Sequence, residues 1–164
     1  GLIEQLDEPR AIYDRPLTAF VADFIGDMNF LDGDVVEAAD GGFAVDAGSD
    51  VVIRGRGITM RGEHVKVGLR PERMVAEPGE PKGVANSAGA SVITKMYLGD
   101  QIQIVATLVN GTSVVVREQR ARANPALDTI HPGDRITISW DAAAPLLLGT
   151  VPAAAASSGE EQQT

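Results

Sequence analysis

The segment Arg70-Pro71-Glu72 places a guanidinium and a carboxylate on either side of a proline. Proline fixes its own backbone φ and cannot continue an inner strand, so we expect Arg70 and Glu72 close together at a strand end. Side chains of this kind can form a fixed ion pair or bind a complementary group on another surface. As an exposed pair that only secures the strand end, they would contribute about 1 kcal/mol or less. All three residues are candidate regulatory or interface residues.

A second candidate group, Tyr97, Gly99 and Asp100, lies at the expected tip of a hairpin. Gly99 permits positive φ, and the Asp100 side chain can accept hydrogen bonds from turn amides, so turn formation explains both. Tyr97 shares a polar side of its strand with Lys95. There it can form a binding surface or leave its hydroxyl in water.

The residue types give no support for catalysis or metal binding. His64 and His131 lie in separate loops without the spacing that brings two histidines to one metal ion. The chain has no cysteine, which excludes a disulfide, a thiolate metal site and a cysteine nucleophile. No G-x-x-x-x-G-K-[ST] phosphate loop and no G-x-S-x-G motif occurs. We therefore predict that this chain is not an enzyme and binds no cofactor.

The charge is strongly negative, with 14 Lys and Arg against 23 Asp and Glu and a formal net charge of -9. Such a field repels nucleic acid. There is no run of 18 apolar residues and no signal-peptide pattern, which favours a cytoplasmic location. Acidic residues dominate 27–50 and basic residues dominate 54–73. We expect the two runs to lie on neighbouring strands and to offset each other.

Apolar alternation with a period of two from Leu31 onward predicts a mainly β region. Glycine-rich turns divide it, and Asn110-Gly111 is a strong hairpin signal. The segment 77–90 is expected to be a loop. Seven or eight short strands of this kind suit a small β-barrel, because closure removes exposed sheet edges. The expected strands are 33–38, 43–46, 50–54, 65–70, 91–98, 101–108, 112–118 and 134–140, with a short one near 145–148.

The two ends of the chain differ from this β region. Residues 1–6 alternate like a strand that has no partner, and Pro9 marks a helix start. A stripe with helical spacing follows and is expected to associate with another surface; it consists of Leu17, Phe20, Val21 and Phe24. The pattern of this N-terminal segment predicts that it is the end of one domain joined to the start of another. Residues 151–164 are rich in Ala, Ser, Glu and Gln and are expected to be disordered.

Four segments carry a family resemblance in this order: 1–29, 67–72, 97–100 and 132–140. They resemble the C-terminal portion of the ATP-binding subunit of bacterial ABC importers, and 24–33 is most similar to the polyamine and ferric-iron branch. In that family this portion is an OB-type β-barrel called the TOBE domain. The resemblance implies a remnant of the nucleotide-binding domain at 1–29, a TOBE barrel at 30–150 and a tail at 151–164.

The function implied by the resemblance is that of a non-catalytic regulatory and dimerisation domain, for polyamine-type transport. The implied partners are a second copy, the nucleotide-binding domain of the same subunit, and the membrane permease subunits. Through the permease the protein would lie peripherally on the inner face of the membrane. ATP and Mg²⁺ would belong to the full-length, ATP-hydrolysing subunit. The cargo and the choice between sensing and tethering stay open.

Two other functions remain as alternatives. An OB-fold can bind single-stranded nucleic acid, but the negative charge and the few aromatic residues oppose this. Related barrels bind an oxyanion such as molybdate. Here the donors would be backbone amides near Gly99 or Gly111, together with Arg70 or Arg117. Fold analogy alone does not establish such a site.

Overall fold

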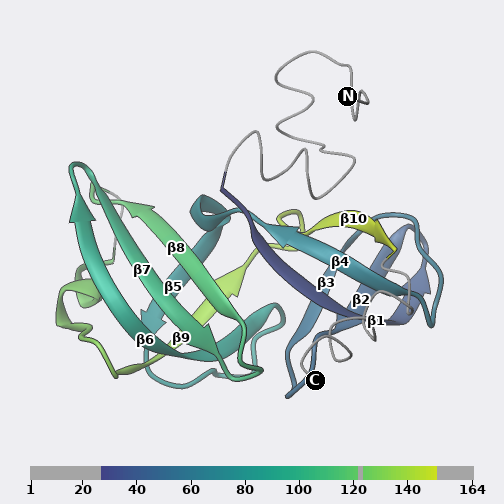
Figure 1. Ribbon diagram of the computed structural model, residues 1–164, viewed down its shortest axis with the longest axis horizontal. Coiled ribbons are helices and arrows are strands. Elements are labelled where there is room, and N and C mark those ends of the chain that lie inside the picture. The colour runs from purple at the N-terminus through teal and green to yellow at the C-terminus, as the bar shows by residue number, and fades with distance from the viewer. Residues whose placement is uncertain (1–26, 122–123, 151–164) are drawn as a thin grey trace, which may run out of the picture.

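The computed structural model describes residues 27–121 and 124–150, which form two curled antiparallel sheets lying side by side (Figure 1). The first sheet has the order β10 (Leu146–Thr150), β4 (His64–Leu69), β1 (Asn29–Ala39), β2 (Gly42–Asp46), β3 (Val52–Arg56). The second has the order β5 (Met74–Pro78), β9 (Arg135–Trp140), β6 (Ser87–Leu98), β7 (Gln101–Leu108), β8 (Ser113–Gln119). Within those residues, no helix has the length and apolarity needed to cross a bilayer.

The chain passes between the sheets twice. The 3-10 helix η1 (Pro71–Arg73) leads from β4 into β5, and the segment after β9 returns to β10. A second 3-10 helix, η2 (Pro125–Thr129), lies between β8 and β9. The second sheet is therefore one continuous segment, from β5 to β9, whereas the first sheet combines β1 to β4 with the distant β10.

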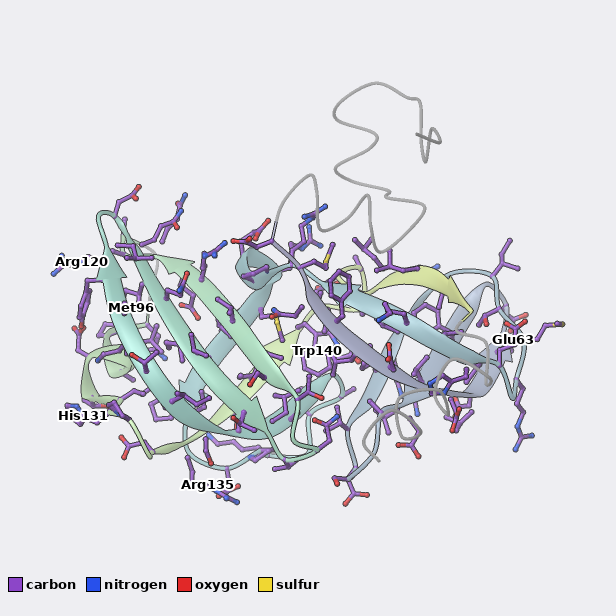
Figure 2. The ribbon with its side chains drawn as sticks, viewed as in Figure 1. Glu63, Met96, Arg120, His131, Arg135 and Trp140 are labelled. Atoms are coloured by element: carbon purple, nitrogen blue, oxygen red, sulfur yellow. The ribbon has the colours of Figure 1, made fainter. Side chains whose placement is uncertain are left out.

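Strand alternation builds the core, because inward-facing residues of both sheets join one buried cluster. Strand β7 is the clearest case, with every second residue from Ile102 to Leu108 buried. Leu31, Ile53 and Val67 contribute from the first sheet. Trp140, which is also buried, lies where the two sheets meet (Figure 2).

Two asparagine side chains join the sheets by pairing with backbone as a neighbouring strand would. The Asn29 carboxamide on β1 accepts from Val115 N–H and donates to Val115 O, both at 2.8 Å. The Asn86 carboxamide, beside β6, accepts from Arg54 N–H at 2.8 Å and donates to Arg54 O at 3.0 Å. Both asparagine side chains are buried, so these bonds are partly shielded from competing water.

The mainly β prediction is confirmed, including the meander of β6, β7 and β8. The expected loop at 77–90 is wrong at both ends, since β5 extends to Pro78 and β6 begins at Ser87. Met74 and Ala76 are buried in alternation, and Pro78 is tolerated because β5 is a sheet edge. Instead of seven or eight strands, the described residues form ten, divided between two sheets.

The predicted offsetting of the acidic and basic runs is confirmed by cross-strand pairs. Lys66 on β4 lies 3.4 Å from Asp32 on the neighbouring β1, and Arg54 on β3 lies 2.8 Å from Glu37 on β1, with β2 between these two strands. The hydrogen bond and the charge of Arg54 lower the pKa of Glu37. These pairs are partly or largely exposed and contribute little to stability.

Candidate functional site

A cleft of about 610 Å³ opens between β5 and β8, the two edge strands of the second sheet. Curling of this sheet brings its edges together, and the Glu118 carboxylate spans them by accepting a 3.0 Å hydrogen bond from Ala76 N–H. The wall is mixed in character: two carboxylates, one guanidinium, two carboxamides and two apolar side chains. The lining residues are Glu72, Met74, Val75, Gln101, Arg117, Glu118 and Gln119.

Asp27 connects this cleft to the start of the described chain. Its carboxylate forms an ion pair with Arg117 on β8. Its backbone carbonyl accepts a long hydrogen bond, 3.5 Å, from Arg70 at the end of β4. Arg117 is further oriented by Gln103, whose side-chain oxygen accepts from Arg117 Nε at 2.8 Å. Arginines from both sheets therefore hold the residue at which the chain enters β1.

The Arg70-Pro71-Glu72 segment is not the fully exposed ion pair that the sequence allowed, because Arg70 is buried. Arg70 is only 5% exposed, so that interpretation is wrong for its guanidinium. Pro71 begins η1, and the turn is closed by a 2.9 Å bond from Arg73 N–H to Arg70 O. This turn reverses the chain between the sheets and places the exposed Glu72 at the cleft.

Burial shapes the electrostatics of the cleft at Glu118. Desolvation raises the pKa of this carboxyl above its usual 4.5, Glu77 raises it further, and the Ala76 N–H bond opposes both effects. A carboxyl with a raised folded-state pKa binds protons more readily when folded than when unfolded. Its ionisation therefore reduces stability as pH rises from about 4.5 through the raised pKa.

Replacing Glu118 with glutamine should remove this pH dependence while keeping an oxygen that accepts from Ala76 N–H. We expect the variant to gain stability relative to wild type between pH 4 and pH 7. The gain should be below about 1 kcal/mol, because a half-exposed carboxylate is screened by water. Urea unfolding at both pH values measures it, with Glu80→Gln, an exposed position, as the control. Equal pH dependence in wild type and Glu118→Gln would contradict this account.

Tyr97 belongs to a separate cluster near the β6–β7 turn. Its hydroxyl donates to the Asp128 carboxylate at 3.0 Å rather than only to water. Lys95 Nζ and Arg120 Cζ lie 5.6 and 5.4 Å from the centre of its ring, within cation–π range. Gly99 adopts the positive φ expected of the turn, and the Asp100 carbonyl accepts from Arg120 N–H at 2.7 Å. Strand β7 then begins at Gln101, which lines the cleft.

Several sequence-predicted residues lie elsewhere or outside the described part. The stripe Leu17, Phe20, Val21 and Phe24 falls in 1–26, outside the described residues, as does the tail at 151–164. Among residues 27–121 and 124–150, no group of three or more His, Cys, Asp or Glu could hold a metal ion. The oxyanion interpretation is weakened because Gly111 N–H already donates to Leu108 O at 2.8 Å.

Sequence reasoning did not identify Asn29 as a link between the sheets, nor Arg117 and Glu118 as parts of one site. A signal was present, because Asn29 and Glu118 occupy inward-facing positions of strands whose other inward residues are apolar. A polar residue at such a position usually has a specific partner. The partners themselves, Val115 and Ala76, are distant in sequence and become visible only in the fold.

Comparison with known proteins identifies this architecture. The TOBE domain family model matches residues 67–148, which include η1, the cleft and the whole second sheet. The spermidine/putrescine import ATP-binding protein PotA of Rubrobacter xylanophilus is 35% identical over 155 residues, covering 91% of this chain and 39% of that protein. PotA of Ruegeria pomeroyi is 35% identical over 144 residues, covering 85% of this chain and 37% of that protein. The chain thus spans less than two fifths of the length of these relatives.

A solved structure shares the fold at low sequence identity. The cytoplasmic molybdate-binding protein ModG, with molybdate bound, superposes with a TM-score of 0.62 at 14% identity. The match covers 76% of this chain and 96% of that one, which confirms the expectation of OB-type β architecture and concerns the fold alone. The chain belongs to the TOBE domain family and corresponds to the TOBE region of ABC importer ATP-binding subunits.

Proposed function

We propose that this chain is the non-catalytic regulatory and dimerisation domain of an ABC importer ATP-binding subunit that serves polyamine-type transport. The polyamine assignment is supported by the names of the curated relatives, which are spermidine/putrescine import proteins. ATP and Mg²⁺ bind to the nucleotide-binding domain of the full-length subunit. That subunit lies on the inner face of the membrane through its permease partners and pairs with a second copy.

One observation carries the regulatory part of the proposal: Asp27 is held by Arg70 near the first sheet and by Arg117 from the second. In the proposed subunit, the nucleotide-binding domain precedes Asp27. A displacement of that domain would therefore act on contacts of both sheets and on the cleft beside them. Contiguous networks of ion pairs and hydrogen bonds can carry coupling between distant sites, and Asp27 belongs to such a network.

The test uses the full-length subunit assembled with its permease and binding protein in proteoliposomes. Arg117→Ala should change the ratio of spermidine uptake to ATP hydrolysis by roughly twofold or more, the lower range of coupling energies. Arg135→Ala is the matched control, because it breaks an exposed pair with Glu80 on the same sheet. Absence of spermidine uptake by the wild-type complex would refute the assignment to polyamine transport. Equal ratios in all three proteins would refute the regulatory role.

A further inference from the structure

The loop 57–63, between β3 and β4, presents apolar side chains to solvent. Ile58 is 97% exposed and Met60 is 67% exposed, more than any other large apolar side chain in the described part of the chain. Both alternate with Thr59, whose side chain turns back into the loop. Exposed apolar surface is a feature of interaction sites, so the loop is a candidate for one.

The loop is held in place by its own hydrogen bonds and by bonds to the first sheet. The Glu63 carboxylate accepts from Thr59 Oγ1 at 2.6 Å and from Met60 N–H at 3.0 Å, and these bonds lower its pKa. Gly62 N–H donates to Val35 O, and Val35 N–H donates to Glu63 O. Ile58 and Met60 are therefore presented from an anchored loop, so binding through them would require little ordering of the backbone.

The charges around the loop complement those of the β5–β8 cleft. Arg56 and Arg61 flank the apolar pair and are exposed. The cleft carries Glu72 and Glu118 together with Arg117, which is paired with Asp27, so its charge is net negative beside the apolar surface of Val75, which is 44% exposed. Its volume of about 610 Å³ falls within the range of sites that enclose small ligands, which leaves room for two side chains.

We propose that the loop 57–63 of one protomer enters the β5–β8 cleft of a second copy and that the exchange is reciprocal. This inference rests on the proposed dimerisation function and assigns its surface. Figure 2 places Glu63 at the end of the first sheet that lies away from the second sheet, so a chain's own loop does not fill its cleft. Reciprocal exchange uses the same two patches on both protomers and gives a closed two-fold dimer.

Cysteine cross-linking tests the contact without background, because the chain contains no cysteine. Ile58→Cys and Val75→Cys are purified separately, mixed and oxidised. We expect a covalent dimer in the mixture and none with either variant alone, since a disulfide requires Cα atoms within about 7 Å. Ile93→Cys, another exposed apolar position, replaces Val75→Cys in the control mixture and should give no dimer. Ile58→Asp should raise the dimer dissociation constant by about tenfold or more.

The outcomes separate this inference from the function on which it rests. Light scattering of the unmodified chain that gives only the monomer mass at high concentration would overturn both. A dimer mass without the Ile58–Val75 cross-link would overturn the loop-to-cleft contact and leave dimerisation standing. A cross-link of Ile58→Cys with itself would show that loop meets loop, which also overturns the contact. Unchanged thermal unfolding of the variants shows that they are folded.

Discussion

Asn29→Ala is expected to lower the free energy of unfolding by about 3 kcal/mol, the cost of leaving two partly buried backbone groups without partners. Asn29 is 6% exposed, and its carboxamide satisfies both the N–H and the C=O of Val115. Strand β8 is a sheet edge, so no neighbouring strand replaces these bonds. Urea unfolding, followed by circular dichroism, measures the change as a shift in midpoint at constant slope.

Two further asparagine substitutions make the Asn29 experiment specific. Asn124→Ala removes an exposed cap, in which Asn124 accepts from Ala126 N–H, and should cost about 1 kcal/mol or less. Asn29→Asp keeps the acceptor for Val115 N–H but loses the donor to Val115 O and buries a charge, so it should destabilise the fold at least as much as alanine. If Asn29→Ala and Asn124→Ala had equal effects, the inter-sheet pairing would not contribute as argued.

Gly33→Ala is expected to cost about 3 kcal/mol or more, at the upper end of what overpacking produces. An added Cβ would lie 2.4 Å from Asp46 O and 2.6 Å from Val45 Cγ1. Asp46 O belongs to the backbone of β2, which pairs with β1, so it cannot move aside without disturbing that pairing. Thermal unfolding, or the yield of soluble protein where the variant does not fold, reports the effect.

Gly42→Ala is the matched control for Gly33 because it lies in the same sheet and has no positive φ. Its nearest neighbour would be Ala39 O at 3.4 Å, an ordinary van der Waals contact. We expect a change within about 1 kcal/mol, since alanine in place of glycine also reduces the entropy of the unfolded chain. Similar losses at both positions would point to a general requirement for glycine in this sheet instead of a local clash.

The candidate site was only partly accessible from the sequence. Pro71 and Gly99 act through backbone geometry, which depends on the residue itself, and both take the strand-end and turn positions expected of them. The burial of Arg70 was not foreseen, because it depends on packing at the junction between two sheets. The hydrogen bond from the Tyr97 hydroxyl to Asp128 was not foreseen either, because the two residues are 31 positions apart and meet only through the packing of the fold.

The sequence by itself determined the mainly β class, the β6–β7–β8 meander and the family, because side-chain alternation and turn residues are local properties of the chain. Only the tertiary structure decided that the strands divide between two sheets, that β5 exists, and that Asp27, Arg117 and Glu118 lie around one cleft. Alternation fixes which face of a strand is buried but not which strand becomes its neighbour. That choice comes from the packing of distant segments, in which Asn29 and Asn86 supply backbone partners across the sheets.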